Sequence, residues 1–404
     1  MSQLNTPGEP HRTTAVILSR VDSIFSRDRR WLAASMALPV AFQVLHRCGL
    51  AENSPFGLLT ETFPQFCLPL MILFACAGFP VYLAAAALAG GTLISLSSFA
   101  NASVPFAVNA PSWGGLLALA AVLYHLVNGD RERARAFCWG SVPVFFTALV
   151  APTGLELGRR IFSTSTYDGI LMHMEAGSFG GTIPFVYFLS LSKAFPWTRL
   201  FLDSVYQALN LVVAAAIGFS IRYGYRRISM PLYFVFSGFF VGFFYGVMPV
   251  AGPRAVLAVT KGLVSFAQTL VPGEYEKNGM PSMHFGWALA VVYLSFELPS
   301  RALRYFAVLF LVLTGFSTLS TGEHHSLDLV IGAPFALALL VPLKTGADVR
   351  LRWKALCIFV ACVLFWYNGI MIGYLAVLPP FALGVFILVS AVLTFLGGRM
   401  LRRA

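Results

Sequence analysis

Long, unbroken runs of apolar residues constrain the fold of this chain more than any other feature. They recur from about residue 31 to residue 397, and most are long enough to cross the hydrocarbon core of a bilayer as a helix. Hydrocarbon offers backbone groups no hydrogen-bond partner, so a spanning segment must be a helix or part of a closed barrel. Because the runs are continuous rather than alternating, we predict an all-α, polytopic transmembrane bundle.

The composition supports lipid rather than water as the surroundings. The 404 residues are 58% hydrophobic and 11% charged, whereas an ordinary soluble domain carries about 25% charged residues. The formal net charge of +11 raises the question of nucleic acid. The basic residues, however, lie in short loops between apolar runs, where orientation in the membrane explains them. We therefore expect membrane lipids as partners and no nucleic acid.

The apolar runs divide the chain into four parts. A polar, cytoplasmic segment at 1–30 precedes accessory transmembrane helices at 31–155, and a catalytic core at 156–345 precedes two C-terminal helices and a basic tail at 346–404. The spans number about twelve, in a range of about ten to thirteen. A shorter run near 183–197 is expected to be interfacial or re-entrant.

Basic residues distinguish the two sides of the predicted spans. They cluster in alternate loops, which the positive-inside rule makes cytoplasmic. The other face then receives segments 155–182, 250–284 and 322–328, which hold most of the polar residues of interest. We expect a protein of a bacterial inner membrane with its active site on this non-cytoplasmic face.

Three short segments on that face contain residues suited to chemistry. They are Gly252-Pro253-Arg254, Pro281-Ser282-Met283-His284 and His324-His325-Ser326-Leu327-Asp328. On a helix, His324 and Asp328 would share a face. A carboxylate that accepts from one ring nitrogen leaves the other nitrogen with its lone pair, which is typical of an oriented nucleophile or base.

The other residues of these segments favour an anionic ligand. Arg254 is a planar cation suited to phosphate oxygens. Ser282 stands where a helix N-cap would stand, and helix N-termini bind anions. His284, two residues later, is placed to give a proton to a leaving oxygen. The sequence thus predicts an anion site with two histidines.

The order Gly-Pro-Arg, Pro-Ser-x-His, His-x-x-x-Asp resembles the type-2 phosphatidic acid phosphatase superfamily over about residues 160–345. It looks most like the branch of inositol phosphorylceramide and sphingomyelin synthases. The resemblance implies a six-helix core, with His324 as a nucleophile that forms a phosphohistidine, His284 as the general acid and Asp328 as the residue that orients His324. It also implies that Arg254 and Ser282 hold phosphate oxygens, without a metal or other cofactor.

Departures from the phosphatase pattern favour transfer between lipids. The span before Gly252 lacks the lysine of that pattern, and Ser317-Thr318 stand where it has Ser-Arg. Fewer cations suit a phosphodiester better than a terminal phosphate, which carries more negative charge. We therefore expect a lipid phosphotransferase. A lipid-phosphate phosphatase is the alternative, since Lys261 or Lys277 in a loop could supply a charge.

Four residues are predicted to contact a headgroup, namely Lys261, Glu323, His325 and Asp168. Two other classes of function also fit part of the pattern. A transporter would suit the number of spans, but the ionisable residues gather at one face rather than at midplane, and no repeat is visible. A metal site built from His284, His324, His325 and Asp328 is a third reading, which sensitivity to EDTA would test.

Overall fold

The computed structural model describes residues 166–223, 230–260, 279–344 and 348–403, together with scattered residues between 44 and 162. All of the regular structure in these ranges is helical. The apolar runs predicted before residue 155 fall almost wholly outside the described residues, as does Lys261.

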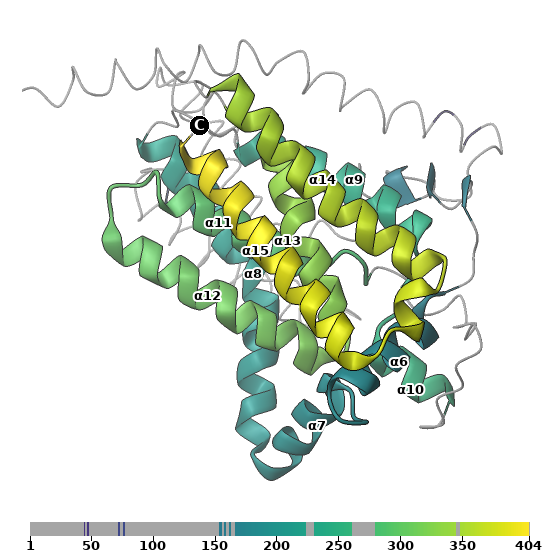
Figure 1. Ribbon diagram of the computed structural model, residues 1–404. Coiled ribbons are helices and arrows are strands. Elements are labelled where there is room, and N and C mark those ends of the chain that lie inside the picture. Colours follow the sequence, from purple (N-terminus) through teal and green to yellow (C-terminus); the bar gives the residue numbers. More distant parts are fainter. Residues whose placement is uncertain are drawn as a thin grey trace, which may run out of the picture.

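Figure 1 colours the helices in the order in which they occur along the chain. In order they are α6 (Asp168–Ser178), α7 (Pro184–Ala194), α8 (Pro196–Tyr223), α9 (Met230–Val247), α10 (Pro253–Thr260), α11 (Met283–Ser295), α12 (Arg301–Thr321), α13 (Ser326–Leu340), α14 (Val349–Met371), the 3-10 turn η2 (Tyr374–Val377) and α15 (Pro380–Arg403). The long apolar stretches of the sequence after residue 200 coincide with the helices α8, α9 and α11 to α15.

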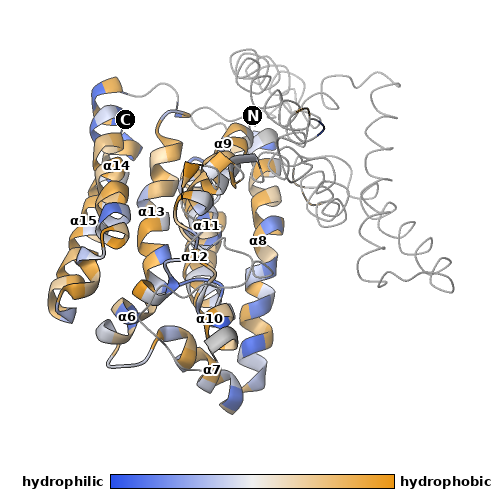
Figure 2. Cartoon of the chain, turned by 90° about the vertical axis from the view of Figure 1, so that its right-hand side faces the viewer, coloured by the Kyte–Doolittle hydropathy of each residue, from blue (hydrophilic) through white to orange (hydrophobic). Residues whose placement is uncertain are grey.

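Several of these helices can cross a membrane. In the described residues, α12, α14, α15 and the Pro196–Ser220 part of α8 are long and apolar enough. Three apolar helices are shorter, namely Leu232–Val247, α11 and α13. Figure 2 shows apolar residues over the surfaces of most of these helices. The chain is therefore an integral membrane protein, while the total of about twelve spans and the six-helix core stay predictions.

Local sequence explains where the helices begin and end. Proline, whose missing N–H costs nothing in a first turn, begins α7, α8, α10 and α15. Serine precedes α11 and α12, and the Ser300 hydroxyl accepts from the N–H of Leu303 at 3.4 Å. Helix α12 ends at Gly322, which has a left-handed backbone (φ +71°) that glycine adopts without strain.

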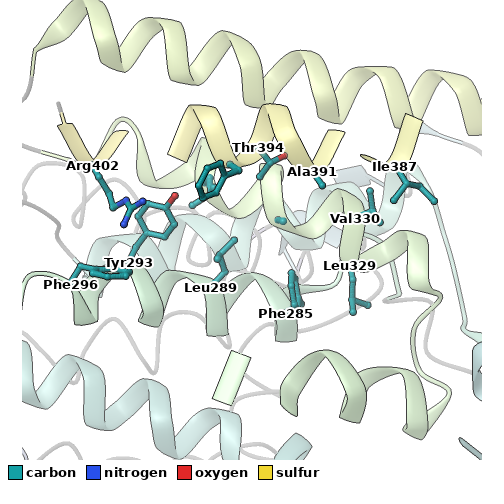
Figure 3. A pocket seen from close by; sticks show the side chains of 13 residues that line it. Phe285, Leu289, Tyr293, Phe296, Leu329, Val330, Ile387, Ala391, Thr394 and Arg402 are labelled. Atoms are coloured by element: carbon teal, nitrogen blue, oxygen red, sulfur yellow. The ribbon is translucent and has the colours of Figure 1, made fainter. Parts of the chain in front are cut away.

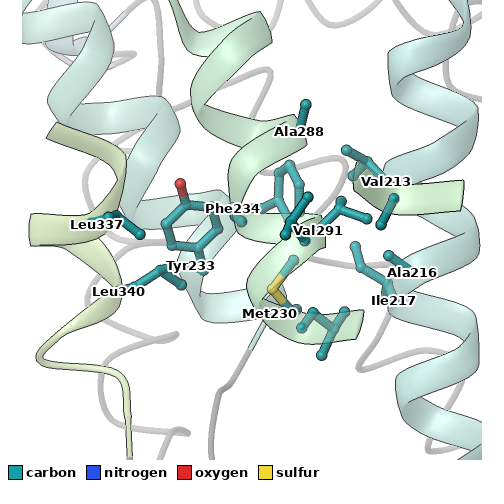
Figure 4. Close-up of a cluster of buried hydrophobic side chains, with 14 of the residues drawn as sticks. Val213, Ala216, Ile217, Met230, Tyr233, Phe234, Ala288, Val291, Leu337 and Leu340 are labelled. Atoms are coloured by element: carbon teal, nitrogen blue, oxygen red, sulfur yellow. The ribbon is translucent and has the colours of Figure 1, made fainter. Parts of the chain in front are cut away.

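The helices α8, α9, α11 and α13 enclose a shared apolar core. Tyr233, Ile217, Ala288 and Leu340 are each fully buried in it (Figure 4). Polar pairs also join helices in the bundle, because the Trp287 indole donates to the Ser237 hydroxyl at 2.9 Å. Such hydrogen bonds matter in lipid, where apolar surface alone gives little drive for helices to associate.

Arg301, Arg350 and Arg402 lie at the end of the bundle opposite the predicted catalytic histidines. Helices α11 and α13 begin at the histidine end, whereas α12 and α14 begin at the other end with Arg301 and Arg350. There Lys344 donates to the Leu401 carbonyl, and the Arg402 guanidinium lies 5.0 Å from the Phe296 ring centre.

Three short helices, α6, α7 and α10, lie together at the histidine end (Figures 1 and 2). Helix α7 has 11 residues, so it reaches only about 16 Å and is too short to span a bilayer. Helix α10 was not distinguished in the sequence, where it follows Gly252 within a stretch expected to be a loop.

Candidate active site

The three segments that the sequence singled out meet through their backbones. The Gly279 N–H donates to the Val250 carbonyl at 2.8 Å, and the Arg254 N–H donates to the Gly322 carbonyl at 3.0 Å. The Ser282 N–H donates to the Asp328 carbonyl at 3.1 Å. These bonds bring the end of α9 and the starts of α10, α11 and α13 to one place.

Two glycines permit this close approach. Gly252 has φ +87°, and a Cβ added to it would lie 2.5 Å from the Glu323 carbonyl oxygen. A Cβ on Gly332 would lie 2.7 Å from the Ser282 carbonyl oxygen. Any larger residue would therefore force the segments apart, and Gly252 would be strained besides.

His324, the predicted nucleophile, is buried and held by a backbone carbonyl. Its Nδ1 lies 2.7 Å from the Gly279 carbonyl oxygen, and its exposed fraction is 3%. Since a carbonyl can only accept, Nδ1 must carry the hydrogen. In the neutral ring, Nε2 then holds the lone pair that a nucleophile needs.

Asp328 lies near His324 but makes its short hydrogen bond elsewhere. Its Oδ2 is 3.6 Å from Nδ1 of His324 and accepts from the His325 N–H at 2.7 Å. The expected direct bond is lengthened because α13 begins at Ser326, so His324 precedes the helix instead of sharing a face with Asp328. Asp328 therefore caps α13 through the His325 N–H. Its carboxylate also lies beside the His324 ring, which the Gly279 carbonyl orients.

His284, the predicted acid, faces His324 across a short gap. The two ring centres are 5.7 Å apart, with planes inclined at 63°. On its other side, Tyr206 of α8 stacks on His284 with ring centres 3.9 Å apart and planes at 20°. Sequence reasoning missed Tyr206, which lies within an apolar run and has no local pattern to mark it.

Ser282 caps α11 as predicted. Its hydroxyl accepts from the Phe285 N–H at 3.5 Å, and the residue has no exposed surface. The start of α11 thus lies beside His284, where free N–H groups favour an anion. Contact between the Ser282 hydroxyl and phosphate stays a prediction.

Arg254 lies at the mouth of the site and is paired with a carboxylate. Its guanidinium contacts Glu323, and the two side chains are 60% and 27% exposed. An incoming phosphate would have to share Arg254 with Glu323. The pair lowers the net positive charge that the site offers.

Asp168 and His325, both predicted to contact a headgroup, lie in a separate buried cluster. Neither has exposed surface. His325 has an extended backbone (φ −80°, ψ 157°), and successive side chains of an extended segment point opposite ways. His324 can therefore face His284 while His325 faces α6.

Both ring nitrogens of His325 meet carboxylates. Nδ1 lies 3.0 Å from Glu175 Oε2, and Nε2 lies 3.2 Å from Asp168 Oδ1. Burial alone would lower the pKa of His325, but the charge of the Glu175 carboxylate and the hydrogen bonds that the ring donates to Asp168 and Glu175 outweigh it and raise the pKa to about 10. The ring is thus an imidazolium at neutral pH. Sequence reasoning placed Glu175 on the active face without a specific role.

The described residues hold no group of three or more His, Cys, Asp or Glu side chains arranged as metal ligands would be. Of the four ligands in the metal reading, His325 has both nitrogens already occupied by Asp168 and Glu175. Its ring is thereby turned away from His284 and His324.

An apolar groove runs along the bundle from the histidine end, between α11, α13 and α15 (Figure 3). Its volume is about 540 Å³. It begins at Phe285 and Leu329, the residues that follow His284 and Asp328, and it reaches Arg402 at the basic end. A groove of this composition suits a hydrocarbon chain.

Comparison with known proteins gave one match. Residues 180–341 match the family described as the PAP2 superfamily, and this range contains Arg254, Ser282, His284, His324 and Asp328. No curated protein and no solved structure matched the chain. The similarity to inositol phosphorylceramide and sphingomyelin synthases accordingly stays a prediction. The match covers less than half of the chain, and it agrees with the resemblance drawn from the sequence motifs.

Proposed function

We propose that this protein is a lipid phosphotransferase that works through a phosphohistidine on His324. The observation that carries the proposal is the pairing of two histidine rings 5.7 Å apart. One of them has Nδ1 held by the Gly279 carbonyl. Such a pair can contact one phosphoryl group from two sides, which suits a nucleophile and a proton donor.

The reaction would take two steps. In the first, Nε2 of His324 attacks phosphorus, the bond from phosphorus to the donor's oxygen breaks, and His284 gives its proton to that oxygen. In the second, the hydroxyl of an acceptor attacks the phosphohistidine and gives its proton to His284, while the N–P bond breaks. Asp328, 3.6 Å from His324, would stabilise positive charge on the ring.

The groove supports a lipid substrate. Its end nearest the site is lined by Phe285 and Leu329, which follow His284 and Asp328 in the chain, and one of its walls is α15, a candidate membrane span. A lipid whose phosphate reached His324 could lay a hydrocarbon chain there. A lipid acceptor could also approach from the side at high local concentration, which favours it over water.

The charges at the mouth support a phosphodiester donor. Arg254 is shared with Glu323, and the phosphatase pattern's extra arginine position is the buried Thr318. We therefore propose transfer of a phosphoryl headgroup from a phospholipid to a ceramide-like or diacylglycerol-like alcohol. Hydrolysis of a lipid phosphomonoester is the alternative, and Lys261 could supply the charge that it needs.

Product analysis would test the proposal. The purified full chain is incubated with labelled phosphodiester or phosphomonoester lipids, with and without acceptor, and the His324→Ala variant serves as the control. The expected result is a new phospholipid that requires acceptor and His324 and that forms equally in EDTA. Fast, acceptor-independent release of phosphate from phosphatidic acid would identify a phosphatase instead. Loss of activity in EDTA would instead support a metal site, the third possibility considered from the sequence.

We also propose that the histidine end faces away from the cytoplasm. The arginines at the opposite end support this orientation through the positive-inside rule. In a chain free of its native cysteines, Glu323→Cys should react with an impermeant maleimide in intact cells, whereas Arg350→Cys should react only after the membrane is opened. The reverse labelling would place the site in the cytoplasm.

A further inference from the structure

A buried polar network joins α6 to two of the three catalytic segments. Besides His325, the Asp168 carboxylate accepts from the Gly252 N–H at 2.8 Å and from the Ala251 N–H at 3.0 and 3.1 Å. The Glu175 carboxylate accepts from the Ser326 N–H and contacts His325.

The geometry requires the network to be charged. A neutral imidazole has one N–H, whereas both nitrogens of His325 lie within hydrogen-bond distance of carboxylate oxygens. Asp168 and Glu175 are seven residues apart, so they share one face of α6. All three side chains are buried. A buried charge is costly unless it is paired and hydrogen-bonded, so each member depends on the others.

We propose that Asp168 and Glu175, acting through His325, are positioning residues for the catalytic loops, an inference that rests on the proposed function. Asp168 fixes the two N–H groups just before Pro253 and Arg254. Glu175 holds the start of α13 through the His325 ring and the Ser326 N–H, and these two residues lie between His324 and Asp328 in the chain. The network would thereby set the distance between the phosphate-binding arginine and the nucleophile. It makes no contact with substrate itself.

Kinetics of the full-length protein would separate positioning from headgroup binding. We expect Asp168→Asn, Glu175→Gln and His325→Gln each to lower kcat by about tenfold to a hundredfold, because small misplacement of a reacting group is costly. KM for the lipid donor should change by less than about threefold. The matched control is His173→Gln, an exposed position on the same helix, which should leave both constants unchanged. A large rise in KM that varies with the donor headgroup, with kcat retained, would show direct contact and overturn the proposal.

A double variant tests whether the residues act as one unit. If they do, Glu175→Gln combined with His325→Gln should lose about as much kcat as the more damaging single change, because the second change removes an interaction that is already broken. Losses that multiply would mean that Glu175 and His325 act independently, contrary to the proposal.

Hydrogen exchange provides a readout that needs no turnover. The Glu175→Asp variant keeps the charge but shortens the side chain, so it should fold and yet weaken the bonds to His325 and Ser326. Peptides covering 248–254 and 322–328 should then exchange faster than in the wild-type protein, with the rest of the bundle unchanged. Unchanged exchange in both peptides would overturn the proposal. Absence of phosphoryl transfer by the wild-type protein would contradict the proposed function. The exchange measurement would still test whether the network holds the two segments in place.

Discussion

At the scale of single residues, the Gly279 carbonyl orients the His324 ring, a role that the sequence analysis gave to the Asp328 side chain. The Gly279 carbonyl bonds His324 at 2.7 Å, whereas the Asp328 carboxylate is 3.6 Å from the same nitrogen. The carbonyl fixes which nitrogen bears the hydrogen, and the carboxylate contributes negative charge and caps α13. The two roles can therefore be separated by mutation.

His324→Ala should abolish transfer, because no other nitrogen takes the place of the nucleophile. Asp328→Asn should lower kcat by less than the roughly 10⁴-fold seen when the aspartate of a serine-protease triad is replaced, since Gly279 still holds the tautomer and an amide oxygen can still accept from His325. Steady-state kinetics on both variants would check this. Equal inactivity of the two would mean that Asp328 is the true orienting group.

Glu323 should restrain Arg254 rather than assist it. Glu323→Gln breaks the ion pair and frees the guanidinium, so KM for an anionic donor should fall by about two- to fivefold, the range expected of a largely exposed pair. Arg254→Gln should raise KM and serves as the opposite case. A higher KM in Glu323→Gln would instead indicate that Glu323 contacts the headgroup, as first predicted from the sequence.

At the scale of elements, α13 is preceded by two histidines that contact different partners. The extended backbone at its N-cap turns His324 toward α11 and His325 toward α6. Local sequence therefore determines more than the start of the helix. It turns the ring of His324 toward His284 and the ring of His325 toward the carboxylates of α6.

The contact between α6 and α13 should weaken in alkali. The pKa of His325 is raised from its usual 6.5 to about 10, so the folded protein binds this proton more tightly than the unfolded chain. The stability that results is complete below about pH 6.5 and is lost as the pH rises through about 10. Thermal unfolding between pH 6 and 10.5 should show this decline, and His325→Gln should flatten it. The same alkaline decline in the variant would assign it to another group.

At the scale of the whole molecule, the groove links the histidine end to the basic end. From Phe285 to Phe296 it follows about 16 Å of α11, and its third wall is α15, which lies outside the family match. The C-terminal helices would then contribute to substrate binding as well as to anchoring.

Filling the groove should penalise long-chain substrates. Ala391→Trp places an indole among the lining residues of α15, whereas Val392→Trp changes an exposed neighbour that does not line the groove. We expect Ala391→Trp to raise KM for long-chain donors and to spare short-chain ones, because the obstruction is steric. The comparison requires four KM values, two donors for each variant. An equal effect of both variants, or an effect independent of chain length, would contradict this role.

The sequence predicted what depends on local pattern. Apolar runs located the helices after residue 200, the serine before α11 proved to be its cap, and the three polar segments meet as expected. Contacts between segments that are distant in the chain could not be predicted from the sequence. The bonds of Gly279 to His324 and of Glu175 to His325 join residues 45 and 150 positions apart, and the stacking of Tyr206 on His284 depends on how α8 packs. None of these has a local signature.

The buried network of Asp168, Glu175 and His325 extends beyond the part of the chain that is similar to other proteins. The family match starts at residue 180, after Asp168 and Glu175. A gene fragment limited to the matched residues would encode His284 and His324 but lack the two α6 carboxylates that contact the His325 ring. If the network positions the catalytic segments as proposed, grafting or truncation guided by homology alone should lower activity, and a transplant should begin upstream of α6.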